Sequence, residues 1–255
     1  MRRILWLCCL IWATVVSAAD RQVGEVRVPV LCYHRFGPSV SDGMTIRTAT
    51  FERQLRYLAD NGYSVIPLRQ LLDHLAGRGP ALPPRPVVIT IDDGHRSVYE
   101  AARPLLRRYK VPVTLFIYPS AISNASYAMS WEQLHELVAG GAIDIQSHTY
   151  WHPNFKIEKR RLSPEAYRTL VEQQLGRARS RLQTRFGTTI DVLAWPFGIY
   201  DAELEQQAAA AGYRAAFSID GRPVSRSERP MALPRYLMVE AIDDRAFARL
   251  VAGER

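Results

Sequence analysis

Apolar runs rich in β-branched residues alternate along the chain with stretches in which apolar positions recur every three or four residues. The runs predict β-strands and the stretches predict amphipathic helices, because side chains alternate between faces in a strand and share one face of a helix every 3.6 residues. The strands are expected at 28–33, 63–66, 87–91, 113–118, 143–146, 192–195, 215–218 and 233–239.

Polar residues mark where three of the helices should begin. Thr50 precedes an apolar helical face and is expected to be an N-cap. Ser130 and Gln133 have the spacing of a capping box. Ser163 followed by Pro164 should open the longest helix, because proline is favoured in the first helical turn.

The order of these elements predicts an α/β fold. Strand and helix alternate six or seven times, and parallel strands need such crossovers. A (β/α) barrel and a doubly wound open sheet are the two candidates. Neither a Gly-rich dinucleotide turn nor a phosphate-binding loop is present, which favours the barrel. No repeat or flexible linker divides the chain, so we expect a single domain with its chemistry at the carboxyl ends of the strands.

The N-terminus has the pattern of a secretory signal peptide. Arg2 and Arg3 precede an apolar run at 4–16, and small residues end it before Asp20. We expect a signal peptide at 1–19 and one catalytic domain at 20–255, in the periplasm, cell envelope or extracellular space. After cleavage no membrane span should remain. The alternative, an uncleaved anchor, would need roughly 20 apolar residues.

Composition narrows the class of protein further. The chain has 255 residues, 47% hydrophobic and 23% charged, as expected of a globular protein. Its net charge is +8, or +6 without Arg2 and Arg3. No basic helix with interleaved aromatic residues occurs, so no nucleic-acid partner is expected. Signal cleavage would leave Cys32 as the one cysteine, which excludes an internal disulfide and predicts a buried thiol.

Two polar clusters follow expected strands and suggest a metal site. Asp92 and Asp93 end the run at 87–91, and adjacent carboxylates there are costly unless a cation lies beside them. His148 and His152 follow the run at 143–146. Two imidazoles and one carboxylate are a common ligand set for a catalytic divalent metal. Without a metal, these would be an ordinary turn and a pair of surface histidines.

Two further clusters have weaker signals when taken alone. Residues 194–201 read Ala-Trp-Pro-Phe-Gly-Ile-Tyr-Asp, which could be core followed by a turn. Residues 32–35 read Cys-Tyr-His-Arg at the end of the first strand, where a structural role is the ordinary one.

Together and in this order, the clusters resemble the motifs of the polysaccharide deacetylase superfamily, also called carbohydrate esterase family four. Asp92-Asp93-Gly94 is similar to its first motif, residues 148–153 match its His-Ser/Thr-x-x-His-Pro motif, and residues 195–198 are similar to its Pro-Tyr-Gly motif. The resemblance covers roughly 28–251 and implies a distorted (β/α) barrel of about seven parallel strands.

The chain departs from the superfamily pattern at two places. Ala194 stands where most members have an Arg that orients the catalytic Asp, and the late Leu-x-His motif is absent. Residues 31–34, 194–198 and 233–236 are instead similar to the poly-β-1,6-N-acetylglucosamine N-deacetylases of biofilm systems.

The resemblance implies the role of each site residue. Asp93, His148 and His152 would bind one divalent metal, with Zn²⁺ expected and Co²⁺, Ni²⁺ or Fe²⁺ as alternatives. Asp92 would be the base that activates water, and His34 is the candidate proton donor for the leaving amine, since an imidazole can donate near neutral pH. Substrate or oxyanion contacts would come from Tyr33, Trp195, Pro196, Phe197, Gly198 and Arg235.

The expected activity is therefore metal-dependent removal of N-acetyl groups from an N-acetylglucosamine polymer, with other exopolysaccharide export proteins as further partners. Within the enzyme class, the alternatives are a peptidoglycan or chitooligosaccharide deacetylase and a glycan O-acetyl esterase. A catalytically silent glycan-binding protein is the alternative of another class, although it would have no need for both the base and all three metal ligands.

Overall fold

The computed structural model describes residues 26–253. The expected signal peptide at 1–19 lies outside the described residues. Within the described part, no helix has the length and apolar character that crossing a membrane requires.

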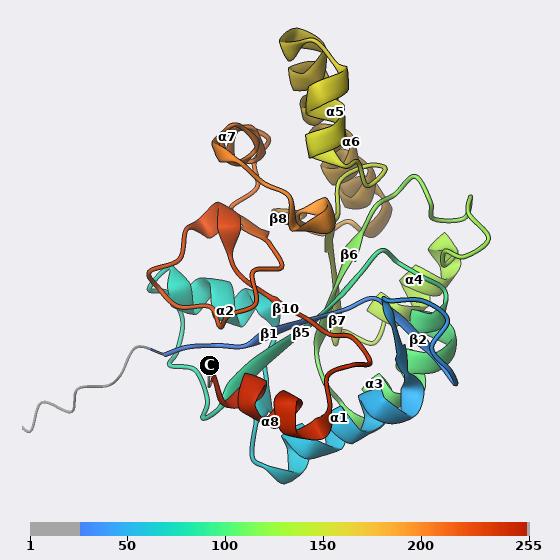
Figure 1. Ribbon diagram of the computed structural model, residues 1–255, viewed down its shortest axis with the longest axis vertical. Helices are drawn as coiled ribbons and strands as arrows, with labels where there is room; N and C mark the ends of the chain where they lie inside the picture. The colour runs from blue at the N-terminus through green and yellow to red at the C-terminus, as the bar shows by residue number, and fades with distance from the viewer. Residues whose placement is uncertain (1–25, 254–255) are drawn as a thin grey trace, which may run out of the picture.

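A parallel sheet forms the centre of the molecule (Figure 1), in the order β10-β1-β5-β6-β7-β8-β9, with β4 paired to the start of β5. Every pairing along this path is parallel. Its strands are β1 (Val30–Tyr33), β4 (Ser64–Val65), β5 (Pro86–Asp92), β6 (Val113–Ile117), β7 (Ile143–Ser147), β8 (Val192–Ala194), β9 (Ala215–Phe217) and β10 (Tyr236–Leu237). A separate pair, β2 (Arg35–Gly37) and β3 (Thr45–Arg47), was not anticipated from the sequence.

The sheet curls into a half-barrel because one segment joins its two edges. Leu233 exchanges backbone hydrogen bonds with β9, donating to Ala216 and accepting from Ser218 at 2.9 and 2.8 Å. A few residues later, Tyr236 pairs with Leu31 of β1. The expected distorted barrel of about seven parallel strands is confirmed. The expected strand at 233–239 is shorter, because its first residues bond to β9 before the chain reaches β1.

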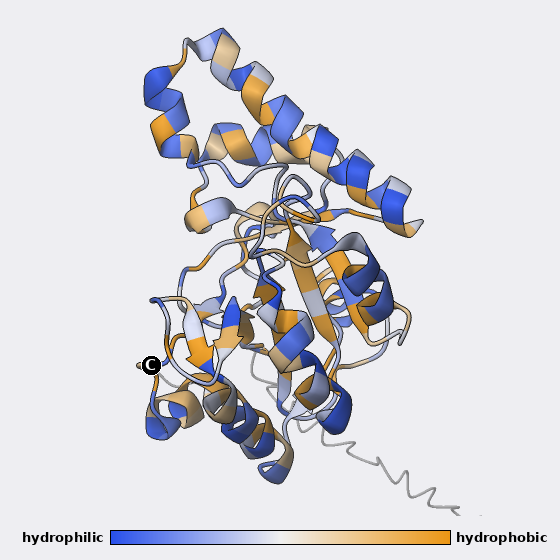
Figure 2. Ribbon diagram, turned by 90° about the vertical axis from the view of Figure 1, so that its right-hand side faces the viewer, coloured by the Kyte–Doolittle hydropathy of each residue, from blue (hydrophilic) through white to orange (hydrophobic). Residues whose placement is uncertain are grey.

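Helices cover the outside of the sheet, and hydrophobic residues gather on the strands and on the helix faces that meet them (Figure 2). They are α1 (Thr48–Asp60), α2 (Leu68–Leu75), α3 (Arg103–Tyr109), α4 (Trp131–Val138), α5 (Phe155–Arg161), α6 (Pro164–Phe186), α7 (Ala202–Ala210) and α8 (Asp244–Ala252), with short turns η1 (Val98–Ala102), η2 (Pro196–Gly198) and η3 (Pro230–Ala232).

Two of the three expected helix starts are confirmed. Ser130 and Gln133 form the capping box of α4, and the Ser163 hydroxyl accepts from the first turn of α6. The expected N-cap at Thr50 is wrong, because α1 already begins at Thr48. The Thr50 hydroxyl donates instead to the carboxylate of Glu240, at 3.0 Å.

The alternation along β5 decides which side chains reach the inside of the half-barrel. Val88 belongs to the inner core cluster, whereas Ile89 and Ile91 belong to the cluster that packs under the helices. Because side chains alternate in a strand, Thr90 and Asp92 face inward together with Val88. The last carboxylate of β5 therefore points into the interior.

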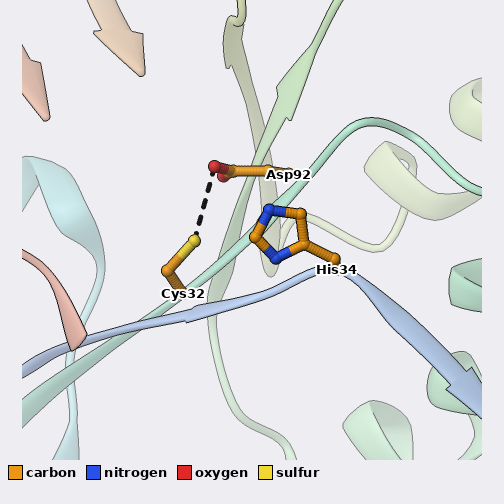
Figure 3. A group of neighbouring side chains, drawn as sticks. All are labelled: Cys32, His34 and Asp92. Carbon is orange, nitrogen blue, oxygen red and sulfur yellow. Dashed lines mark hydrogen bonds between the residues drawn. The ribbon is translucent and has the colours of Figure 1, made fainter. Parts of the chain in front are cut away.

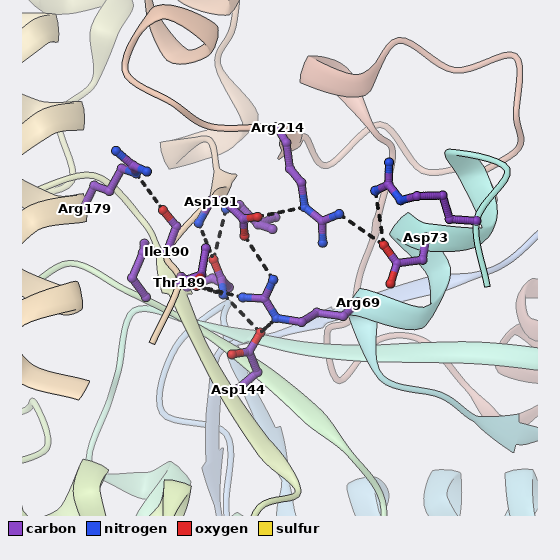
Figure 4. A network of polar contacts seen from close by, with 11 residues as sticks. Arg69, Asp73, Asp144, Arg179, Thr189, Ile190, Asp191 and Arg214 are labelled. Atoms are coloured by element: carbon purple, nitrogen blue, oxygen red, sulfur yellow. Dashed lines mark hydrogen bonds and ion pairs between the residues drawn. The ribbon is translucent and has the colours of Figure 1, made fainter. Parts of the chain in front are cut away.

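The amino ends of the later strands carry a network of paired charges (Figure 4). Arg69 lies 3.4 Å from Asp144 and 3.2 Å from Asp191, and Arg214 bridges Asp191 and Asp73 at 2.9 and 3.3 Å. Arg69 and Asp73 belong to α2, so these ion pairs hold that helix against the strands. The histidine and aspartate clusters lie at the other, carboxyl ends.

Candidate active site and metal centre

Asp93, His148 and His152 converge at the carboxyl ends of β5 and β7. The Nε2 atoms of His148 and His152 lie 3.5 and 3.6 Å from Oδ1 of Asp93, and the three ligand atoms all lie within 4.8 Å of one another. Ligands about 2.0–2.2 Å from a tetrahedral zinc ion are separated by about 3.4 Å. The three side chains therefore fit one small divalent cation.

The orientation of His148 is set by the backbone at the end of β8. Its Nδ1 lies 2.8 Å from the carbonyl oxygen of Ala194, and a carbonyl can only accept, so Nδ1 carries the proton and Nε2 faces Asp93. Burial alone would lower the pKa of His148. The negative charges of Asp92 and Asp93, with the bonds to Asp93 and Ala194, raise it above its usual value. Such a fixed tautomer is typical of a metal-binding histidine.

His152 and Asp93 are both held in the form that binds cations. Burial, together with the charge of His148, lowers the pKa of His152 to about 4. Burial would raise the pKa of Asp93, but its bond to His148 and the surrounding imidazoles lower it to about 2. At neutral pH the site therefore offers a neutral imidazole beside an ionised carboxylate.

Arg235 binds the second carboxylate, Asp92, deep inside the half-barrel. Its Nη1 and Nη2 donate to Oδ1 and Oδ2 of Asp92 at 2.8 and 2.7 Å, while Nε donates to the carbonyl of Ser218 at 3.0 Å. Burial would raise the pKa of Asp92, but the charge and hydrogen bonds of Arg235, with the charge of His148, lower it well below its usual value. Asp92 is thus kept ionised in a buried position.

Ala194 stands where the third motif of most superfamily members has an arginine, and here Asp92 is bound by an arginine from another part of the chain, Arg235. Arg235 lies between Leu233, which bonds to β9, and Tyr236, which pairs with β1, so the segment that joins the sheet edges also places the guanidinium. The expected contact of Arg235 with substrate or an oxyanion is wrong, because the side chain is 0% exposed.

A pocket of about 410 Å³ opens over these carboxylates and histidines. It is lined by His34, Arg35, Met44, Asp92, Asp93, Tyr118, His148, His152, Trp195, Phe197, Gly198, Ile219 and Leu237. Most of the expected site residues are therefore brought together around one cavity.

Three other expected contact residues are buried. Tyr33 is 1% exposed, and its hydroxyl donates to Gln54 at 2.8 Å in the outer core. Pro196 is the buried first residue of the turn η2. Trp195 borders the cavity but is completely buried, and its indole nitrogen donates to the carbonyl of Met231. Sugar stacking on Tyr33 or Trp195 is thus excluded by burial.

Phe197 and Gly198 do reach the pocket, on a strained turn. Phe197 is 56% exposed, and its ring centroid lies 4.6 Å from that of His152. The N–H of Gly198 donates to the carbonyl of Trp195 at 2.9 Å, which leaves the N–H of Phe197 as the remaining candidate from this turn for an oxyanion. A Cβ on Gly198 would lie 2.4 Å from the side chain of Ile219.

Left-handed backbone conformations gather at this site. Asp93, Thr149, His152 and Phe197 have φ values of 73°, 63°, 62° and 57°. A non-glycine residue in this region costs of order 1–3 kcal/mol and persists only where the surrounding structure over-determines it. The histidine turn is fixed in part by the Thr149 hydroxyl, which accepts from the N–H of His152.

His34 occupies the side of the pocket next to Cys32 and Asp92 (Figure 3). The Cys32 thiol donates to Asp92 at 3.4 Å and is fully buried, as expected. Burial lowers the pKa of His34 despite the charges of Asp92 and Asp93. Its Nδ1 is buried and has no hydrogen-bond partner among the described residues.

Tyr118 and Met44 line the pocket without having been expected there, and Arg35 was expected only as a member of the cluster at 32–35, with no role of its own. Tyr118 directly follows β6, the strand between β5 and β7, so its place in the strand order was the signal that could have found it. Its ring lies 5.3 Å from that of His152, and its hydroxyl shares a hydrogen bond with Tyr127. Arg35 and Met44 come from the unexpected β2–β3 segment, which had no such signal.

Comparison with known proteins agrees with this geometry. The sequence profile described as Polysaccharide deacetylase matches residues 79–216, more than half of the chain. A Staphylococcus aureus protein named poly-beta-1,6-N-acetyl-D-glucosamine N-deacetylase is 26% identical over 212 residues, covering 81% of this chain and 71% of its own length.

Two solved structures share the fold. A Streptococcus pyogenes deacetylase, PplD, solved in complex with acetate superposes with a TM-score of 0.79 at 20% identity, covering 89% of this chain and 99% of that one. IcaB from Ammonifex degensii superposes with a TM-score of 0.75 at 28% identity, covering 90% and 97% of the two chains. The chain belongs to the polysaccharide deacetylase family and is an enzyme of that family.

Proposed function

We propose that this deacetylase removes N-acetyl groups from poly-β-1,6-N-acetylglucosamine with the help of one divalent metal ion, Zn²⁺ being the expected one. The observation that carries the proposal is the convergence of Asp93, His148 and His152 beside the ionised Asp92 in one pocket. The choice of polymer is supported by the similarity to the Staphylococcus aureus enzyme.

Asp93, His148 and His152 would hold the metal through Oδ1 and the two Nε2 atoms. When bound, a divalent metal supplies Lewis acidity that makes water a better nucleophile and an acetyl carbonyl a better electrophile. His148 is already oriented for this role by its bond to Ala194.

Asp92 is assigned the role of base. Its carboxylate borders the pocket next to the metal ligands, and Oδ2 lies 3.9 Å from Nε2 of His148. Arg235 keeps the carboxylate ionised and fixes its plane, so that it can take a proton from the attacking water without first losing one.

His34 is assigned the transfer of a proton to the leaving amine. Because its pKa is lowered, His34 is neutral at pH 7 and must gain a proton before it can donate one. Asp92, whose carboxylate lies in the same group of polar atoms, is the side chain placed to pass that proton on. The N–H of Phe197 would stabilise negative charge on the acetyl oxygen.

An extracytoplasmic location is part of the same proposal. Residues 1–19 have the composition of a signal peptide, and a polymeric substrate would be met in the cell envelope or outside it. Other exopolysaccharide export proteins are then the expected neighbours.

The test is acetate release from β-1,6-linked and β-1,4-linked N-acetylglucosamine oligomers by metal-stripped protein, with and without added Zn²⁺, Co²⁺ or Ni²⁺. Metal-dependent release from the β-1,6 series alone would support the proposal. Release from the β-1,4 series would move the substrate to chitin-like or peptidoglycan chains. Bound metal with no release from either would overturn the N-deacetylase assignment in favour of an esterase or a glycan-binding protein.

A further inference from the structure

Helices α5 and α6 form an arm, residues 155–187, that projects well beyond the sheet (Figures 1 and 2). The arm leaves the core just after His152 and returns to β8, which leads into Phe197 and Gly198. Both ends of the arm are therefore joined to walls of the pocket. Lys159 also ties the arm to α7 through Asp201 and Glu203.

The arm carries most of the net charge of the protein. It contains nine basic and three acidic residues, a net charge of +6, whereas the whole chain has +8. The remaining 222 residues thus sum to only +2. Lys159 and Arg179 bond to the rest of the protein, at Asp201, Glu203 and the carbonyl of Ile190, and the fold described above gives no role to the remaining surplus of positive charge.

Several of these cations have no carboxylate partner. Lys156, Arg160 and Arg168 are exposed and form no ion pair within residues 26–253. The guanidinium of Arg177 lies over the ring of Tyr150 at 4.1 Å and that of Arg185 over the ring of Trp131 at 4.9 Å. None of these five cations has a carboxylate partner within residues 26–253, in contrast to Lys159 and Arg161.

Exposed apolar side chains accompany the cations. Ile157 is 50% exposed, and Trp151, four residues before the start of the arm, is 41% exposed. Phe155 and Glu158 are the buried side of α5, so Lys156, Ile157 and Arg160 share its outward side. Ala166 is exposed, and Leu162 and Leu170 are partly exposed, around a shallow hollow at the start of α6.

We infer that the arm is a docking surface for a bilayer that contains anionic phospholipids. Basic residues around exposed aliphatic and tryptophan side chains are the composition that binds such an interface, since the cations meet the headgroups and the apolar groups enter the acyl boundary. The exposed Ile157 favours a bilayer over an anionic polysaccharide, which offers no apolar phase. The proposed substrate is neutral and its product cationic, so neither accounts for the charge.

The bound membrane would lie on the side of the molecule where the pocket opens, because the arm emerges from the metal-binding turn. Docking would then hold the active site close to the membrane surface. The exclusion of the glycan as the ligand of the arm rests on the proposed function, in which the polymer is uncharged.

The test is co-sedimentation of the purified chain with vesicles of phosphatidylglycerol and phosphatidylcholine, compared with phosphatidylcholine alone. Binding should need the anionic lipid and weaken with salt. The triple variant Lys156→Gln/Arg160→Gln/Arg168→Gln should bind about 100-fold more weakly, because each basic residue near such a surface contributes roughly fivefold. Ile157→Ser should weaken binding with no change in charge.

The matched control is Arg107→Gln/Lys110→Gln/Arg245→Gln, which removes three exposed, unpaired cations from α3, its C-terminal end and α8. It should bind nearly as well as the unmodified chain, and all variants share the same residues 1–25. Equal losses in the two triple variants would overturn the inference. So would equal binding to the two vesicles, or binding to soluble polyphosphate but not to vesicles.

Discussion

Arg235 and Asp92 form a bidentate ion pair in the interior of the half-barrel, with N–O distances of 2.8 and 2.7 Å. Both side chains are almost completely removed from solvent. Two buried charges of this kind stabilise a protein only as a pair, because either one alone would be left without compensation.

Replacing Arg235 with Met should therefore destabilise the protein by about 3–5 kcal/mol and remove most activity. Chemical unfolding followed by circular dichroism gives the first number, and acetate release gives the second. The double variant Asp92→Asn/Arg235→Met should recover part of the lost stability but none of the activity, since no unpaired charge remains. If the two substitutions lowered the free energy of unfolding additively, so that the double variant lost the sum of the two single losses, the two residues would not act as a pair.

Substitutions of the two adjacent aspartates should have different effects on kcat and on metal affinity. Asp92→Asn should lower kcat about 10²–10⁴-fold, the usual contribution of a general base, while metal affinity stays close to that of the unmodified protein. Asp93→Asn should weaken metal binding itself, because Asp93 lies between both histidines. Calorimetric metal titration of the two variants separates the roles. Full activity in Asp92→Asn would contradict the base assignment.

His152 should make the metal-free protein sensitive to acid. Burial, with the charge of His148, lowers the folded-state pKa of His152 to about 4, below its ordinary value of about 6.5. Between these pH values the unfolded chain binds more protons at this residue, so the stability that His152 contributes is lost as pH falls from about 6.5 to 4. With chelator present, the free energy of unfolding should fall more steeply in this window for the unmodified protein than for His152→Asn. Parallel curves would contradict the assignment.

Gly198 should not tolerate even a methyl group. Its φ of +66° is in the left-handed region, and an added Cβ would lie 2.4 Å from Ile219 and displace a wall of the pocket. Gly198→Ala should therefore lower activity as well as stability. Gly141→Ala is a matched control, because Gly141 has a φ of +74° and open space around its Cβ position. The control should lose only about 1 kcal/mol and remain fully active. Equal behaviour would show that crowding against Ile219 is unimportant.

The sequence predicted the parts of this enzyme that local chemistry determines. The strands at 87–91 and 113–118 and the capping box at Ser130 were found because apolar runs rich in β-branched residues and capping residues act over a few positions. Asp92, Asp93, His148 and His152 were found because parallel strands bring their carboxyl ends to one edge.

The side-chain positions that the sequence did not predict depend on contacts between distant segments. Arg235 was expected near substrate, but its place is decided by the bonds of Leu233 to β9 and of Tyr236 to β1, which are set by the curl of the sheet. Thr50 bonds to a carboxylate 190 residues away, and no capping rule contains that information. Tyr33, the last residue of β1, is likewise buried because α1 packs over it, and its hydroxyl donates to Gln54 of that helix.

Two substitutions of Phe197 should have the same effect on KM but different effects on the free energy of unfolding. Its ring is exposed at the pocket beside His152, in a backbone conformation with a φ of 57° that favours glycine. Phe197→Ala should raise KM for oligosaccharides severalfold with little change in kcat, because the ring is proposed to contact sugar and is not assigned to the chemistry. Phe197→Gly should raise KM equally but be about 1 kcal/mol more stable than Phe197→Ala, since glycine adopts this φ without a Cβ penalty. Steady-state kinetics and thermal unfolding of the two variants check both parts. Unchanged KM in both variants would remove Phe197 from the substrate site, and equal stability would show that the turn is not strained.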